Sequence, residues 1–285
     1  MANSIRRTTS HVRSSSWPCT PYPLESSIED LLLKITSSSS SPSSSVAYIC
    51  NNLYDIKNLY EGINNLIQCS MNQKVLSLGE HQSVVEEVLE GSLGLLEACS
   101  STNDVLSMMK ESIVELQSCL RRKSSEQEKD INAYLMSRKR IQKMANKCLK
   151  KLHKLNLEKD GKYNIPSLKM LNKAEIISFS ALKYVLAYFS KPTNKGKSWS
   201  LMSKLMQSKS ISYDTQLDSN EIMKIDNVIF AHGAKKTNVD VKMSQDLLKQ
   251  LGALEVSVQE IEGSLEAISR CLLRTRVSLL NVISH

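Results

Sequence analysis

The sequence predicts an all-α protein: an elongated helical bundle of long, heptad-patterned helices, preceded by a disordered, serine-rich N-terminal tail. Three observations support this. Apolar residues recur every three or four positions over long stretches, as on the buried face of an α-helix. Only 5% of the residues are aromatic and only nine are glycine, whereas sheets use aromatic strands and glycine-rich turns. Serine and proline are concentrated in the first 45 residues.

Residues 1–45 are expected to lie outside the bundle. Pro18, Pro21 and Pro23 predict extended chain to about residue 23, because proline lacks the N–H that a helix interior needs. A short amphipathic helix follows, over about 24–35. Residues 36–45 are nearly all serine, interrupted by Pro42, and are expected to form a flexible linker. The bundle should therefore occupy 46–285 as a single domain.

Heptad spacing and capping signals predict the next helices. The first long helix begins at Val46 and ends near residue 67. The second apolar run spans 85–120, and the polar residues at 100–103 leave one bent helix or two linked helices as alternatives. Ser124 and Ser125 mark the start of a helix that ends near residue 157. Another helix follows Pro166 and ends before residue 192. Shorter helices are expected at 199–206 and 221–231.

The last helix, over about 239–282, has the longest repeat. Its stripe of positions spaced four and three apart is apolar at all but one residue: Leu247, Leu251, Leu254, Val258, Ile261, Leu265, Ile268, Leu272, Thr275, Leu279 and Val282. One flank of the stripe carries three charges, at Glu255, Glu262 and Arg276, and the opposite flank is nearly all small and uncharged. Two-stranded coiled coils usually have complementary charges on both flanks.

The flanks of this helix therefore indicate packing against helices of the same chain. Leu273, Val277 and Leu280 are expected to widen the buried arc, and Gly252 and Gly263 to allow close approach of neighbours. The protein is expected to be monomeric or weakly oligomeric.

The seven cysteines are scattered and form no C-x-x-C pair, so we interpret them as small hydrophobic residues in a reducing compartment. A cytoplasmic or nuclear location follows, with a membrane-peripheral one as a further possibility. No apolar run reaches the ~18 residues needed to span a membrane. The basic start of the chain fits an ordinary disordered tail better than a plastid or mitochondrial transit peptide.

Catalytic signatures are incomplete. Residues 196–198 resemble the end of a phosphate-binding loop, but Lys191 stands where the first glycine is required, and no strand precedes it. The five histidines lack metal-ligand spacing to one another or to a cysteine. We therefore expect a non-enzymatic protein with no cofactor and no metal.

Positive charge is concentrated at 121–162, where 14 Lys and Arg face five Asp and Glu. On a helical wheel, seven cations fill one arc of about 120°. We call them the basic face: Lys139, Arg140, Lys143, Lys147, Lys150, Lys151 and Lys154. Apolar residues lie opposite: Tyr134, Ile141, Met144, Ala145, Cys148, Leu152 and Leu155.

This pattern fits a bundle helix with its lysines in water. It also fits a surface that binds anionic lipid, calmodulin or another acidic partner. Nucleic acid is disfavoured, because no aromatic residues alternate with the lysines.

The tail contains a candidate phosphorylation motif. Arg13, Ser14, Ser16 and Pro18 form R-S-x-S-x-P. Phosphorylated Ser16 would have the spacing that 14-3-3 proteins bind through an arginine cluster. The alternative is an unmodified tail.

Several blocks of the sequence resemble the plant-specific BYPASS-like proteins. In order, they are HVRSSSWP, YPLESSIEDLL, LYDIKNLYEGINNLI, EEVLEGSLGLLEACSSTNDVLSMMKESIVELQSCLRRK, YLMSRKRIQKM and RTRVSLLNVISH. The resemblance implies an all-helical protein without established catalytic activity, and it supplies no binding residues. The lysine-rich middle of the chain and Trp17 depart from the usual family pattern.

The family's founding member is linked to root and shoot development through control of a root-derived mobile signal. The resemblance therefore implies a regulatory or adaptor role in plant development. The alternative is a peripheral membrane protein that uses the basic helix at 138–154.

Overall fold

The computed structural model describes residues 21–38, 45–122, 127–154, 163–191, 221–233 and 241–284. Its elements are α1 (Pro21–Ser38), α2 (Val46–Gln68), α3 (Ser70–Leu76), a 3-10 turn η1 (Gly79–His81), α4 (Gln82–Arg122), α5 (Gln127–Lys154), α6 (Pro166–Ser190), α8 (Glu221–Gly233) and α9 (Val241–Ile283). The described residues contain no strand, and the predicted all-α class is confirmed.

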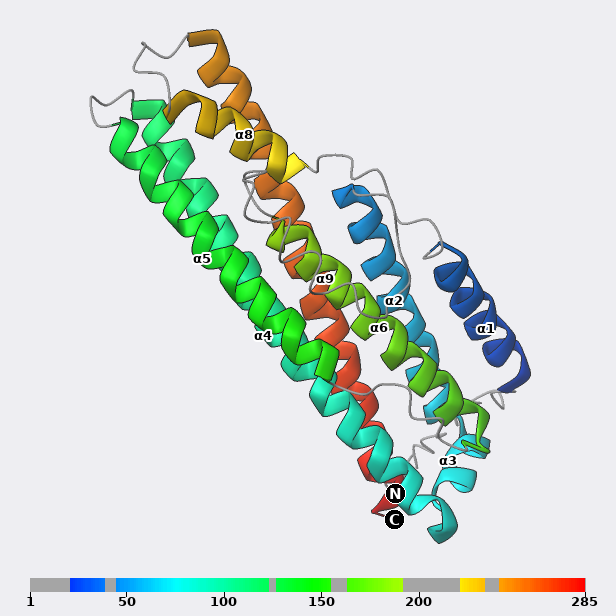
Figure 1. Cartoon of the computed structure of the whole chain (residues 1–285). Coiled ribbons are helices and arrows are strands. Elements are labelled where there is room, and N and C mark those ends of the chain that lie inside the picture. Colours follow the sequence, from blue (N-terminus) through cyan, green and yellow to red (C-terminus); the bar gives the residue numbers. More distant parts are fainter. Residues whose placement is uncertain are drawn as a thin grey trace, which may run out of the picture.

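The helices form an elongated bundle around α9 (Figure 1). The central helix α9 packs against α2 on one side and α4 on the other, while α6 contacts α2, α4 and α5. The long helices α4 and α5 lie side by side along one edge, and α1 lies at the opposite edge, against α2 and α6. The short helix α8 crosses one end of the bundle, where it packs on α5 and α9.

The apolar stripe of α9 is buried at all eleven positions, as its spacing predicts. Its charged flank faces α4, where Glu255 accepts a hydrogen bond from Gln117 (2.9 Å). Farther along, Glu262 accepts from Ser107 (3.0 Å) and forms an ion pair with Lys110. This flank therefore binds a helix of the same chain.

Two details of α9 differ from expectation. Leu273, Val277 and Leu280 do not widen the buried arc, because each is more than 40% exposed. Gly252 and Gly263 do not mediate close packing either: a Cβ atom at either position would meet nothing within 4 Å. The reason is the same in both cases. With α2 and α4 covering its two flanks, the remaining side of α9 faces solvent.

The first helix begins earlier than predicted and belongs to the core. Pro21 and Pro23 lie in its first turn, where backbone N–H groups have no partner within the helix and proline therefore costs little. Three apolar residues of α1 are buried in the same hydrophobic core as the rest of the bundle: Ile28, Leu32 and Ile35. An ideal Cβ on Gly62 of α2 would lie 3.1 Å from Ile28 Cγ1, so this glycine permits the close approach. The expected boundary at residue 46 thus leaves out part of the packed core.

The other expectations have mixed outcomes. Residues 82–122 form one helix, and Thr102 satisfies its hydroxyl within that helix by donating to the carbonyl of Ala98 (2.8 Å). The short α3 and η1 were not predicted. The proposed cap at Ser124 and Ser125 and the proposed helix at 199–206 lie outside the described residues.

Candidate interaction site on the two faces of α5

The sequence places opposite chemistries on the two faces of α5, and the structure shows where each face points. All seven residues of the basic face are exposed. Ile141, Ala145 and Leu152, on the opposite side, are buried in the core. The helix contacts α4 and α6 through this apolar side, so the cations project away from the bundle.

The basic face makes few ionic contacts. Lys151 Nζ lies 2.5 Å from Glu97 Oε1 on α4, and both side chains are more than half exposed. Exposed pairs of this kind contribute about 0–1 kcal/mol. The other six cations form no ion pair with the described residues. Met136, one turn before Arg140 on the same side of the helix, is 56% exposed.

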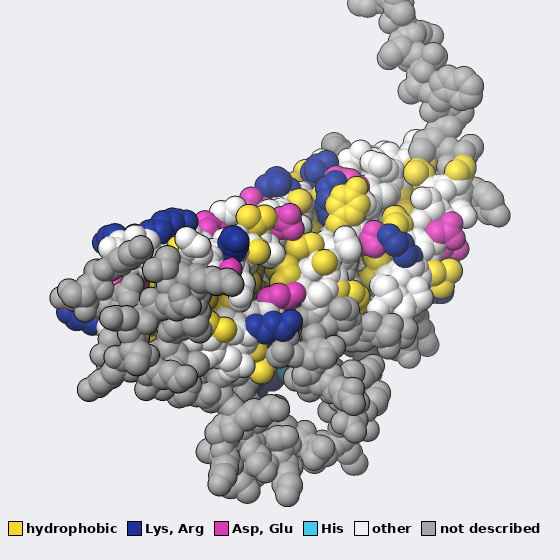
Figure 2. All heavy atoms as spheres, turned by 90° about the horizontal axis from the view of Figure 1, so that it is seen from above, with side chains coloured by type: hydrophobic (Ala, Val, Ile, Leu, Met, Phe, Trp, Pro, Cys, Tyr) yellow, Lys and Arg dark blue, Asp and Glu magenta, His cyan; other side chains and the backbone are white. Residues whose placement is uncertain are grey.

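Between residues 139 and 154 the helix carries no Asp or Glu, so the charges of the basic face are all of one sign. On the face of the molecule in Figure 2, Lys and Arg side chains lie next to Asp and Glu side chains, with hydrophobic side chains between them. Mixed surfaces like this one largely neutralise their own field. Successive unpaired cations on one helix face instead produce a local positive potential that attracts acidic groups.

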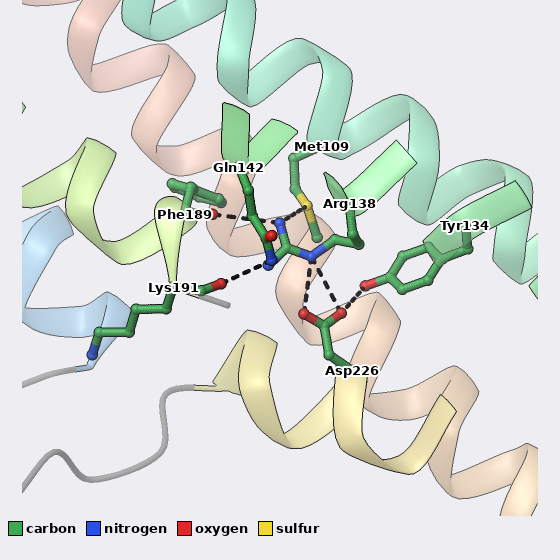
Figure 3. Close-up of polar contacts among 7 residues, drawn as sticks. All are labelled: Met109, Tyr134, Arg138, Gln142, Phe189, Lys191 and Asp226. Atoms are coloured by element: carbon green, nitrogen blue, oxygen red, sulfur yellow. Dashed lines mark hydrogen bonds and ion pairs between the residues drawn. The ribbon is translucent and has the colours of Figure 1, made fainter. Parts of the chain in front are cut away.

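The inward side of α5 contains a buried cation, Arg138, which pairs with Asp226 of α8 (Figure 3). Neither side chain has any exposed surface. Arg138 Nε lies 3.0 and 3.2 Å from the two carboxylate oxygens of Asp226, and the Tyr134 hydroxyl donates to the same carboxylate (2.8 Å). Burial raises the pKa of Asp226, while the charge of Arg138 and the bonds from both partners oppose that rise.

The same cluster caps the C-terminal end of α6. Arg138 Nη1 donates to the carbonyl of Phe189 (3.4 Å), and Gln142 donates to the carbonyl of Lys191 (3.0 Å). The last carbonyls of a helix lack partners within it and carry partial negative charge, so a cation and an amide from α5 stabilise them. The Lys191 ammonium points away from the cluster in Figure 3. Arg138 thus joins α5, α6 and α8.

One donor of the cluster is unsatisfied. Arg138 Nη2 is buried and has no hydrogen-bond partner among the described residues. An unpaired buried donor costs about 1–3 kcal/mol, and more when it is charged.

The Tyr134 hydroxyl keeps its proton in this cluster. Burial raises the pKa of Tyr134 well above its usual value of 10.0, and the negative charge of Asp226 raises it further. Tyr134 therefore remains a neutral donor at physiological pH.

This cluster was not predicted, although the sequence contains a signal for it. Arg138 occupies a core position of α5, in the series Ile131, Tyr134, Arg138, Ile141, Ala145, Cys148 and Leu152, spaced three and four apart. In α8, Asp226 lies among Ile222, Ile225 and Ile229. One cation in the apolar stripe of one helix and one anion in the apolar stripe of another indicate a buried ion pair, because a buried charge without a partner is too costly.

The remaining sequence candidates do not join this site. The motif formed by Arg13, Ser14, Ser16 and Pro18 lies outside the described residues. Within the part of the chain that the structure describes, no group of three or more His, Cys, Asp and Glu side chains could hold a metal ion. None of the described helices is long and apolar enough to cross a membrane.

Comparison with known proteins identifies the family. Searches of curated proteins and of solved structures each gave no match. The profile of the family described as Protein BPS1 matches residues 52–282, which include most of α2 and α9 and everything between them. This match confirms the resemblance that the sequence blocks indicate. The family is of a regulatory, non-catalytic type, and membership suggests a role in plant development. The chain therefore belongs to the Protein BPS1 family.

Proposed function

We propose that this protein is a non-enzymatic adaptor in root and shoot development, and that it binds an acidic partner protein through the basic face of α5. The observation that supports the proposal is the arrangement of this face: seven exposed cations, six of them without an ion pair to the described residues. From residue 139 to residue 154 the face is about 22 Å long at 1.5 Å per residue. That length matches about four turns of an acidic helix or an extended acidic segment.

A charge-neutralised variant with a matched control tests this proposal. The test variant replaces Lys139, Lys143, Lys147 and Lys150 by Gln. The control replaces four exposed lysines elsewhere by Gln, so that the change in net charge is the same: Lys74, Lys169, Lys173 and Lys249. Proximity labelling in plant cells should lose acidic neighbours with the test variant and keep them with the control. Identical labelling by both variants would exclude the basic face as the binding surface.

A second candidate function is peripheral binding to an anionic membrane through the same face. The observation that favours it is Met136, an exposed apolar side chain next to the cations, since membrane-surface helices combine cations with side chains that insert. Sedimentation with phosphatidylserine-containing vesicles distinguishes the two candidates. Binding that disappears at high salt and in the test variant supports the membrane candidate, and the absence of pelleting refutes it.

The N-terminal motif remains a separate prediction. If Ser16 is phosphorylated, 14-3-3 proteins should capture the chain from a phosphorylating extract, and the substitution Ser16→Ala should abolish capture. Capture unchanged by Ser16→Ala would show that this motif is not the binding site.

A further inference from the structure

We propose that the groove filled by α8 is a helix-binding site, that α8 is its built-in occupant, and that a partner's amphipathic helix bearing a glutamate can replace α8. The inference goes beyond the proposed function, because it concerns the inward side of α5 and not the basic face.

The contacts of α8 have the form of a ligand helix in a groove. It is 13 residues long, and helices of about 12–15 residues or fewer are marginal on their own in water. Within residues 221–229, for which burial is described, the buried residues are Ile222, Ile225, Asp226 and Ile229, at positions i, i+3, i+4 and i+7. This is the spacing with which amphipathic helices occupy hydrophobic grooves. At its N-terminal end, Glu221 accepts a bond from Tyr188 of α6 (2.6 Å).

The groove selects an acidic helix because of Arg138. Its guanidinium has no exposed surface, and its other contacts are the Phe189 carbonyl and the Met109 sulfur, so the carboxylate of Asp226 supplies its negative charge. An occupant without a carboxylate at this position would leave a buried cation without a counter-charge. The chemical class of the partner follows: aliphatic residues at i, i+3 and i+7, with a carboxylate at i+4.

The native occupant α8 leaves one hydrogen-bond donor of Arg138 unused. Asp226 bonds Arg138 through Nε, and Nη2 remains without a partner among the described residues. A glutamate is one methylene longer, so its carboxylate can bond Nε and Nη2 together, in the forked geometry that arginine and carboxylate prefer. A partner helix with glutamate at i+4 therefore gains a bond that α8 does not make, and this gain allows it to compete with α8.

Displacement does not require the bundle to open. The described contacts of α8 include those with α5, α6 and α9, and these three helices also pack against other members of the bundle. Residues 192–220 and 234–240 connect α8 to the rest of the chain. A chain spans up to about 3.3–3.6 Å per residue when extended, so the seven residues of the shorter connection reach roughly 23–25 Å. That length lets α8 leave the groove while both α6 and α9 stay in place.

A labelled peptide binding to the full-length chain tests the proposal. The probe is a synthetic peptide with the sequence of residues 221–233 and the change Asp226→Glu. It should bind at least tenfold more tightly than the same peptide with Asp226→Asn, and a scrambled peptide of equal charge should not bind. In the full-length variant Arg138→Met, the preference for glutamate should disappear. Equal affinity of the Glu and Asn peptides for the wild-type chain would overturn the proposal.

Two further measurements on the wild-type chain are independent of how Arg138→Met folds. Hydrogen exchange should be faster in α8 than in the α9 segment from Val258 to Leu265, because α8 must leave the groove before a partner helix can enter it. Equal protection of the two segments would refute helix replacement. Photo-crosslinking from position 225 of the peptide should reach α5 or α9 beside Arg138. Crosslinks confined to the basic face would show that the acidic peptide binds the surface lysines instead.

Discussion

Arg138 and Asp226 illustrate how differently an ion pair behaves in the core and at the surface of this protein. Both side chains are fully buried, and their mutual attraction offsets part of the cost of removing two charges from water. Lys151 and Glu97 are closer together but mostly solvated, so water already stabilises each of them separately. The distance between the charged atoms does not predict which pair matters more for stability. Burial does, because it determines the cost of removing one partner.

The single substitutions Arg138→Met and Asp226→Leu should each lower the free energy of unfolding by about 3–5 kcal/mol, since each leaves one buried charge without its partner. The double variant should lose much less than the sum of the two single losses, because it removes both charges together and the remaining cost is that of the Tyr134 hydroxyl and the Phe189 carbonyl left without these partners. Urea unfolding followed by circular dichroism measures all three variants. Glu97→Gln serves as the surface control and should change stability by less than about 1 kcal/mol. Additive losses in the double variant would contradict the pairing.

Cys99 predicts a pH dependence of stability. Burial raises the pKa of its thiol from 9.0 to about 11, opposed by a hydrogen bond with Ser269. Below pH 9 the thiol is protonated in the folded and unfolded states alike. Between about pH 9 and pH 11 the unfolded state loses its proton more readily, so stability falls as pH rises. At about pH 10.5 this loss amounts to roughly 2 kcal/mol, at 1.36 kcal/mol per pKa unit.

The variant Cys99→Ala isolates that contribution. It should be less stable than the wild type near pH 8, because it loses buried volume. The difference in free energy of unfolding between the two proteins should shrink by about 2 kcal/mol near pH 10.5. At that pH only the wild type is destabilised by holding in the folded state a thiol that ionises in the unfolded state. Urea unfolding at both pH values measures the change. A difference that stays constant with pH would show that the thiol does not titrate as described.

At the scale of the helix, glycine serves different purposes in α4 and α9. An ideal Cβ on Gly91 would lie 2.5 Å from Glu175 Oε2, and Glu175 of α6 is only 5% exposed, so its carboxylate has little room to move. At Gly263 a Cβ would meet nothing within 4 Å. The first glycine is therefore required by packing between helices, whereas the second only weakens its helix.

Alanine substitutions should separate these roles. Gly263→Ala should raise the free energy of unfolding by about 1 kcal/mol, the difference in helix propensity between the two residues. Gly91→Ala gains the same propensity but must displace a buried carboxylate, so it should be less stable than the wild type. Thermal unfolding of the two variants provides the comparison. Stabilisation by both substitutions would mean that Glu175 adapts at little cost.

The success of prediction from sequence followed the length of each element. All eleven positions of the apolar stripe of α9 are buried as predicted, because each of its many turns repeats the same signal. The seven residues of α3 are too few to show a period, and η1 is shorter still. The start of α1 was predicted too late because proline was treated as a helix breaker at positions where the first turn tolerates it.

The candidate site was predictable on one face of α5 only. Surface exposure of the basic face follows from the helical period of its own sequence. The partner of Arg138 lies 88 residues away along the chain, and no local pattern pairs residues across that separation. The exposed residues of α9 also depend on distant parts of the chain. Leu273 and Val277 are apolar and four positions apart, as on a buried helix face, but they are buried only if another helix covers that side.

For the whole molecule, the position of α9 determines which surfaces remain for contacts with other molecules. Its stripe and both flanks are used within the chain, by α2 and α4. Heptad patterning often indicates a dimeric coiled coil, but here the positions that would form it are already buried. The exposed hydrophobic residues of α9 are thus separate from its heptad core, and a self-association of this protein would have to use them or another outer surface.

We therefore expect a monomer, with a mass near 32.0 kDa by multi-angle light scattering over a wide concentration range. A stable dimer would contradict this expectation, and a variant with Leu273, Val277 and Leu280 changed to Ser would locate the contact. These residues are exposed, so their replacement should leave unfolding nearly unchanged. Ile261→Ala, from the buried stripe, is the contrasting control and should cost about 2–5 kcal/mol. A dimer abolished by the serine variant would place the interface on the outer side of α9. A dimer that persists in it would instead place the interface on another outer surface, since exposed apolar side chains also occur on other helices, such as Tyr54 of α2 and Val114 of α4.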